Sequence, residues 1–305
     1  MVSSETQINT VNLSEVVGET AGESVAETGT ELSGETHDEI VHENTLFAEP
    51  IAHIGSFPVT NSLMTSGLAL IIILVLALAI KRKIKTVPTG LQNAMEMIIE
   101  GFLGIFDGVT GSRKKSLKFA PLVLAFFFFV LINNWMGILP GVGSIGQVAL
   151  MHGEKVFIPY LRGGTADLNT TLALATIGVV VSHILGIIAI GAWKYFNKFI
   201  NIKAFLEIPK KVAKDPTILL VNPIKAFVGV IEIIGEVAKI ASLSFRLFGN
   251  VFAGEVLLAS MAAILAFGVP IPFLFLEVLV GLIQALIFAM LILTYLTINT
   301  TAEEH

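Results

Sequence analysis

Three polar side chains interrupt an apolar stretch near the C-terminal end of the chain. The stretch from Ser242 to Glu255, SLSFRLFGNVFAGE, carries Arg246, Asn250 and Glu255. A guanidinium stays protonated at any accessible pH, so Arg246 cannot relay protons. It can force a nearby carboxylic acid to ionise, and it can block proton leakage between two polar routes. Because an ionised group inside a membrane span costs at least about 2.5 to 3.5 kcal/mol, the pattern indicates a functional role.

Helical geometry sorts these residues into two faces. At about 100° per residue, Glu255 lies on the opposite side of the helix from Arg246, which excludes a salt bridge between them. Asn250 shares the face of Arg246 together with three earlier charges: Glu232, Glu236 and Lys239. For those three, a solvated helix face at the membrane interface is an equally good interpretation. No acid shares the face of Arg246 within one turn, so its carboxylate partner must come from another protein.

The composition places the chain in a membrane. Apolar residues make up 54% of the 305 residues and charged residues 14%, and the mean hydropathy is +0.82. Several apolar runs approach the roughly 20 residues that cross about 30 Å of hydrocarbon as a helix. The absence of cysteine excludes disulfides and thiolate metal sites. We therefore predict an all-α membrane protein with about five membrane-embedded helices and one interfacial amphipathic helix.

Charge divides the chain into two parts. Residues 1–49 contain 11 acids and no Lys or Arg, so the remaining 13 acids and all 19 bases give residues 50–305 a balance of 19 − 13 = +6. The first part is rich in Glu, Ser, Thr and Gly and has little apolar surface, which predicts a disordered acidic tail outside the membrane. It lacks the pattern of a signal peptide. Residues 50–305 are the predicted membrane domain.

Basic clusters orient the predicted spans. Three spans are expected at 63–80, 119–139 and 168–193, with an amphipathic interfacial helix at 88–112. The bases at the cytoplasmic ends are Lys81, Arg82, Lys83, Lys85, Arg113, Lys114, Lys115, Lys118, Lys194, Lys198, Lys203, Lys210, Lys211 and Lys214. By the positive-inside rule the N-terminus is outside and the C-terminus is cytoplasmic. A glycine-rich external loop is expected at 140–167.

The last two apolar segments are expected to form a long tilted hairpin. Asn222 and Pro223 resemble a helix start, and the helical pattern then continues to Phe267. Those 46 residues would be roughly 69 Å long, more than twice the hydrocarbon thickness, so the helix must tilt or kink. The final helix is expected at 273–299. It carries Glu277 and Gln284, seven residues apart, which offer Glu255 or Arg246 polar neighbours across the hairpin.

Three weaker sequence signals are not assigned to a functional site. The glycines at 141, 143 and 146 match G-x-G-x-x-G, but in an external loop they indicate a turn rather than a dinucleotide site. His37 and His42 lie in the acidic tail and do not form a convincing metal site. His183 is alone within a span and is left unassigned.

The ordered motifs resemble one membrane-protein family. The run SLSFRLFGNVFAGE, followed by EVLVGLIQALIFAMLILTYL and a terminal EEH, is similar to subunit a of the rotary F-type ATP synthase in its bacterial form. Weaker matches are NNWMGILPG from Asn133, ADLNTTLALA from Ala166 and HIGSFPVTNS before the first span. The resemblance covers residues 50–305 in order.

The resemblance implies roles for the polar residues. Arg246 matches the arginine that faces the carboxylate of a rotating c-subunit ring, and Gln284 matches the glutamine beside it. Positions of two proton half-channels match Asn250, Glu255, Glu277 and Glu232, and a polar pair at the outer access matches Asp167 and Asn169. Relatives often have histidine where this chain has Glu277. A buried pair of acids would titrate as a unit, so the separate roles of Glu255 and Glu277 stay open.

The implied function is that of a non-catalytic stator subunit in an energy-transducing membrane, most simply the bacterial plasma membrane. Its implied partners are the c-subunit ring, the peripheral stalk b subunits, the lipid bilayer and the carried ion, H⁺ or Na⁺; neither cofactor, metal nor nucleic acid is expected. The chain has no phosphate-binding loop for ATP. An autonomous channel or secondary transporter is the rival hypothesis, although such proteins more naturally show an internal repeat, and a purely structural anchor is a third.

Overall fold

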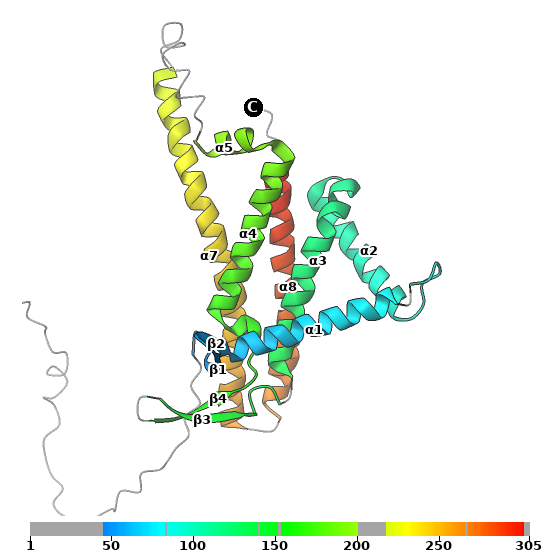
Figure 1. The fold of residues 1–305 in the computed structure, drawn as a ribbon, viewed down its shortest axis with the longest axis vertical. Coiled ribbons are helices and arrows are strands. Elements are labelled where there is room, and N and C mark those ends of the chain that lie inside the picture. The colour runs from blue at the N-terminus through cyan, green and yellow to red at the C-terminus, as the bar shows by residue number, and fades with distance from the viewer. Residues whose placement is uncertain are drawn as a thin grey trace, which may run out of the picture. The chain divides into compact units, whose positions relative to one another are not determined.

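A computed structural model describes residues 45–82, 84–139, 141–151, 154–200, 218–265 and 268–301. All of them belong to one compact unit (Figure 1). Several predictions fall outside the described residues: the tail up to residue 44 with His37 and His42, the lysines between 201 and 217, and the terminal EEH.

Within the described residues, five helices are long and apolar enough to cross a membrane. They are α1 (Asn61–Lys81), α3 (Arg113–Ile138), α4 (Leu168–Ile190), α7 (Ile218–Ile264) and α8 (Pro270–Thr300). The predicted class, an all-α membrane protein with about five embedded helices, is confirmed. The predicted boundaries lie within a few residues of the observed ones, because a long apolar run defines a span locally.

Two boundaries differ from the prediction for clear reasons. The span expected to end at residue 193 ends at Ile190, since Gly191 has φ 94°, and a separate short helix, α5 (Ala192–Ile200), follows. Helix α7 begins at Ile218, so the helix start expected at Asn222 and Pro223 is wrong. The apolar residues before Asn222 extend the helix by one turn, and the proline lies inside it.

The helix expected at 88–112 is α2 (Leu91–Thr110), which lies between α1 and α3 in the chain. Its apolar face buries Leu103 and Phe106, and its opposite face is exposed. The left-handed conformation of Gly111 (φ 67°) ends the helix. This amphipathic pattern fits a helix that covers one side of the bundle.

Two antiparallel hairpins lie at the same end of the bundle as the turn between α7 and α8 (Figure 1). The first pairs β1 (Pro50–Ile54) with β2 (Phe57–Thr60), and the second pairs β3 (Gly146–Met151) with β4 (Glu154–Pro159). The second hairpin and a short 3₁₀ helix, η1 (Gly164–Ala166), occupy the region expected to be an irregular loop. Gly141 and Gly143 have φ of 98° and 82°, in keeping with the predicted turn.

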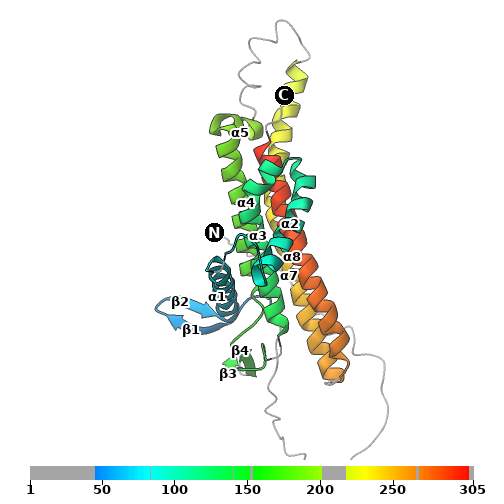
Figure 2. The same ribbon diagram turned by 90° about the vertical axis from the view of Figure 1, so that its right-hand side faces the viewer.

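Helices α7 and α8 pack side by side as the expected hairpin (Figure 2). The 47 residues of α7 amount to about 70 Å at 1.5 Å per residue. Helix α1, with 21 residues, has about the length of a perpendicular span. In Figure 1, α1 runs across the direction of α7 and α8. If α1 follows the membrane normal, the hairpin is therefore steeply tilted, as its length requires.

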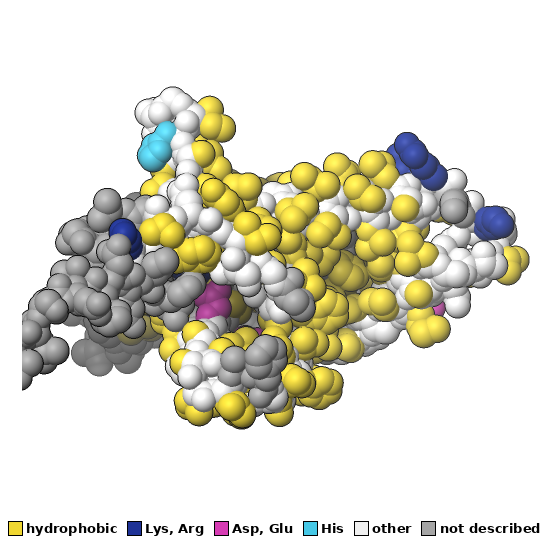
Figure 3. Space-filling view, turned by 90° about the horizontal axis from the view of Figure 1, so that it is seen from below, with side chains coloured by type: hydrophobic (Ala, Val, Ile, Leu, Met, Phe, Trp, Pro, Cys, Tyr) yellow, Lys and Arg dark blue, Asp and Glu magenta, His cyan; other side chains and the backbone are white. Residues whose placement is uncertain are grey.

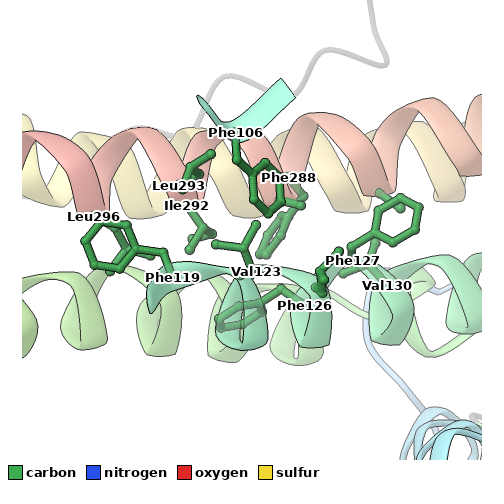
Figure 4. Close-up of a cluster of buried hydrophobic side chains, with 14 of the residues drawn as sticks. Phe106, Phe119, Val123, Phe126, Phe127, Val130, Phe288, Ile292, Leu293 and Leu296 are labelled. Atoms are coloured by element: carbon green, nitrogen blue, oxygen red, sulfur yellow. The ribbon is translucent and has the colours of Figure 1, made fainter. Parts of the chain in front are cut away.

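The core of the bundle lies between α3 and α8, with α2 covering it (Figure 4). The aromatic run of α3 supplies Phe126 and Phe127, and the ring centroids of Phe126 and Phe288 are 5.8 Å apart. Val123, Val130 and Ile292 are completely buried. Because lipid is as apolar as these side chains, close packing rather than hydrophobicity holds the helices together. This packed core fixes the position of the polar residues of α8.

Candidate functional site

Arg246 lies on an exposed face of α7. Among the described residues, neither a hydrogen bond nor an ion pair joins its guanidinium to another part of the chain. Residues at 242, 249 and 253 share this exposed face, and all three are small: Ser, Gly and Ala. Small side chains around a single arginine allow another helix to approach closely. The face is therefore suited to a partner that brings its own carboxylate.

Asn250 and Gln284 link the two long helices one turn beyond Arg246. Nδ2 of Asn250 donates a hydrogen bond of 2.7 Å to Oε1 of Gln284. Gln284 is only 3% exposed, whereas Asn250 lies on the open face of α7. The sequence predicted that Gln284 would offer a polar neighbour to Glu255 or Arg246 across the hairpin; in the structure its hydrogen-bond partner on α7 is Asn250.

The NNW motif of α3, Asn133–Trp135, forms hydrogen bonds to the backbone of α8 close to Gln284. Nδ2 of Asn134 donates to the carbonyl of Gly281 at 3.0 Å, and Nε1 of Trp135 donates to the carbonyl of Val278 at 3.1 Å. Its first residue, Asn133, accepts a hydrogen bond of 3.1 Å from Ser66 of α1. One short motif thus joins three helices, which explains why a polar triplet lies in an apolar span.

Glu255 faces away from Arg246, as helical geometry predicted, and pairs with a different arginine. Oε2 of Glu255 accepts hydrogen bonds from Nε and Nη2 of Arg162 at 3.1 and 3.0 Å. Both residues line a pocket of about 560 Å³, to which Thr45, Glu49 and Asn61 also contribute. In Figure 3, which views this end of the molecule, acidic side chains lie in a recess among hydrophobic ones. The pocket offers water a path towards Glu255.

Glu277 of α8 approaches the same turn of α7. A Cβ placed on Gly254 would lie 2.2 to 2.3 Å from the carboxylate atoms of Glu277. The carboxylate therefore packs directly on the backbone next to Glu255. The structure thus brings Glu277 to the backbone beside Glu255, and helical geometry places Glu255 on the side of α7 away from Arg246.

Asp167 and Asn169 begin α4 and occupy a separate polar cluster. Asp167 caps the helix by accepting from the backbone N–H of Asn169 at 3.1 Å. Its carboxylate also accepts from Ser62 at 3.1 Å, from Thr170 at 2.9 Å and from the backbone N–H of Ala48 at 3.2 Å. Asp167 is buried and Asn169 is exposed. The cluster anchors residues 46–49 to the start of α4, so the boundary of the folded unit lies before the expected residue 49.

The charges of the early part of α7 meet α4 and α5. Nζ of Lys239 donates to Glu236 at 2.8 Å, and Nε2 of His183 lies 3.2 Å from the same carboxylate. The Nδ1 of His183 and the hydroxyl of Tyr195 are 2.5 Å apart. Burial and then the nearby acids, Glu236 and Glu232, raise the pKa of Tyr195 to about 12. These charges therefore form a packed network and are not a merely solvated face.

Sequence reasoning missed two participants, Arg162 and Tyr195. Arg162 lies in a loop, where no helical periodicity relates it to Glu255, and 93 positions separate the two. The sequence signal that could have identified Arg162 was its position as a lone arginine in the loop between Gly146 and the start of α4. Tyr195 lies beyond the end of a span, and only the break at Gly191 turns it back onto His183.

These features define a class: a multi-pass helical membrane protein with polar groups on opposite sides of one long tilted helix. Residues 62–297 match the family model described as ATP synthase A chain. The chain is 29% identical over 248 residues to ATP synthase subunit a of Moorella thermoacetica, covering 81% of this chain and 93% of the relative. It is 33% identical over 238 residues to that of Campylobacter jejuni, covering 78% and 89%, and 31% identical over 236 residues to that of Geobacter sp. strain M21, covering 77% and 86%.

The chain therefore belongs to the ATP synthase A chain family. It is a membrane-embedded, proton-translocating stator subunit of a bacterial F-type ATP synthase and is not itself catalytic. The rival hypotheses of an autonomous channel, a secondary transporter and a structural anchor are set aside.

Proposed function

We propose that Arg246 is the group that meets the carboxylic acid of each ring subunit as it passes. The observation that carries this proposal is the exposed guanidinium of Arg246, which has no hydrogen bond or ion pair among the described residues and shares its face with three small residues. In a low-dielectric contact, a fixed cation strongly favours the carboxylate over the carboxylic acid. Arg246 thereby makes the ring carboxylate release its proton, while Asn250 and Gln284 orient the contact.

On this proposal the outer route runs through the pocket beside Glu255 and then past Glu277. Support comes from the pocket's opening at the hairpin end of the bundle and from the contact between Glu277 and Gly254. Asp167 and Asn169 hold the outer rim, because Asp167 ties residues 46–49 to α4. A proton delivered by this route neutralises the ring carboxylate, which can then enter lipid.

The inner route begins on the opposite side of α7, at Glu232. Its support is the network of Glu236, Lys239 and His183, which places titratable groups on the same face as Arg246. Each charge that crosses the whole membrane supplies about 2.3 kcal/mol per 100 mV. The chain is oriented with its N-terminus outside and its C-terminus in the cytoplasm, as the basic clusters indicate.

The partners are the c-subunit ring, at the face of Arg246, and the b subunits of the peripheral stalk. The carried ion is H⁺. The acidic tail is proposed to be a solvated external arm, and deleting residues 1–44 tests whether it affects assembly or rate.

The test is ATP-driven and respiration-driven proton pumping in membrane vesicles that carry the whole complex. Arg246→Ala is expected to assemble and to lose coupled pumping. Arg246→Lys is also expected to fail, since a compact ammonium has different geometry and can lose its proton. Arg82→Ala, which removes an exposed arginine at the end of α1, is the control and should pump normally. Normal pumping by Arg246→Ala would contradict the proposed mechanism.

A further inference from the structure

All three nitrogens of the Arg162 guanidinium, Nε, Nη1 and Nη2, donate hydrogen bonds. Nε and Nη2 bind Oε2 of Glu255, and Nη2 also donates to the carbonyl of Thr45 at 2.9 Å. Nη1 lies 3.3 Å from the hydroxyl of Thr45 and 3.4 Å from the carbonyl of Phe47. With the residue only 9% exposed, these contacts hold the cation in one place. Arg162 is a fixed charge and not a mobile surface side chain.

The arginine occupies only one oxygen of Glu255. A Cβ on Gly163 would lie 3.5 Å from the other oxygen, Oε1, so that oxygen faces a glycine without a side chain. Glu255 and Gly163 both line the pocket. The carboxylate thus keeps one oxygen for the cation and one oxygen within reach of the pocket.

Glu277 has a different environment although it is close to Glu255. Among the described residues, it takes part in neither an ion pair nor a hydrogen bond. The charged groups around Glu255 are therefore Arg162 from the loop before η1, Glu277 from α8, and Glu49, which lines the same pocket. Arg162 is the one cation of this set, and its ion pair is with Glu255.

We propose that Arg162 is a positioning residue of the outer route, which makes Glu255 a transient proton carrier that passes each proton on to Glu277. This inference rests on the proposed function. A proton that arrives through the pocket binds Oε1 of Glu255 and weakens the ion pair. The pair is restored when the proton leaves Glu255 for the carboxylate of Glu277, which becomes the carboxylic acid. Arg162 keeps its own proton throughout and favours the inward step.

The test measures ATP synthesis by complete complexes in vesicles as the pH of the entry compartment is varied at a constant electrical potential. Without Arg162, Glu255 retains its proton to higher pH. For Arg162→Gln and Arg162→Met we expect the midpoint of the rate profile to move up by about one unit or more, the usual effect of removing an opposite charge at contact distance. Arg162→Lys should restore most of the wild-type midpoint, because it retains the charge.

Arg113→Gln is the matched control. It removes another arginine–carboxylate pair with an N···O distance of 3.0 Å, that of Arg113 with Asp107, at residues that do not line the pocket, so the midpoint should not move. A uniform loss of rate with an unchanged midpoint in the neutral variants would overturn the proposal. So would failure of both neutral variants to assemble, since Arg162 would then serve the fold. If Arg246→Ala still pumps, the proposed function itself fails; if Arg246→Ala is inactive and the Arg162 midpoint is unmoved, only this inference fails.

Discussion

Asn250 and Gln284 form a hydrogen bond of 2.7 Å between α7 and α8, one turn from the exposed Arg246. The bond joins a residue on the open face to one that is almost completely buried. The position of the open face is therefore tied to the core between α3 and α8.

Gln284→Ala should lower coupled proton pumping several-fold, because Asn250 loses the acceptor that holds it beside Arg246. Adding Asn250→Ala should cause little further loss, as expected when two changes remove one interaction. The control is Asn299→Ala, which removes a comparable bond of 2.9 Å from Asn299 to Ser182 between α8 and α4. That change should cost about 0.6 kcal/mol of stability and leave pumping intact. Additive losses at Asn250 and Gln284 would show that they act separately.

Gly254→Ala should impair pumping without impairing assembly. The new methyl group would overlap the carboxylate of Glu277, and that carboxylate, as the end of a flexible side chain, can turn away. Glu277 would then leave the place next to Glu255. Gly101→Ala is the control, since its added methyl group meets no atom within 4 Å. Pumping rates normalised to the amount of assembled complex measure the effect, and equal rates in the two variants would contradict it.

Gly186→Ala should destabilise the contact between α4 and α8. Its Cβ would lie 2.6 Å from the backbone carbonyl oxygen of Asn299 and 2.7 Å from the ring of Tyr195, so a helix must shift. Overpacking of this kind typically costs about 1 to 3 kcal/mol. Gly67→Ala places a methyl group in open space on α1 and should be neutral. Thermal denaturation of the detergent-solubilised complex compares them, and equal midpoints would refute the expected collision.

The junction of α2 and α3 should loosen in acid. The nearby Ser116 side chain, followed by the hydrogen bond and charge of Arg113, lowers the pKa of Asp107 below 3.8; Arg113 lies 3.0 Å away. A lowered pKa gives stability that is present above the unfolded value and lost as the pH falls through the folded value. Because the chain has no cysteine, a spin label on Lys114→Cys reports on this junction alone.

We expect the label to become more mobile as the pH falls below about 3.8, the ordinary carboxyl value. Asp107→Asn should be mobile at neutral pH and insensitive to acid over the same range. An acid response that persists in Asp107→Asn would assign the transition to another group.

The sequence predicted the spans, the amphipathic helix, the hairpin of α7 and α8, and the opposite faces of Arg246 and Glu255. These features depend on apolar length and on about 100° of rotation per residue, both of which are local. The sequence could not predict the conformations of the segments that connect the helices. The β3–β4 hairpin, the turn at Gly191 and the cluster around Asp167 all depend on contacts between distant segments.

The amino-acid sequence by itself determined that Arg246 lies in a membrane helix without an acid on its own face within one turn. Only the tertiary structure decided that Glu255 pairs with Arg162, 93 positions away, and that Asn250 pairs with Gln284, 34 positions away. Helical periodicity specifies the direction of a side chain relative to its own axis. The partner that a side chain contacts depends on how α3 packs against α8 and on where the loops contact the bundle. Those two features determine the positions of the partner atoms.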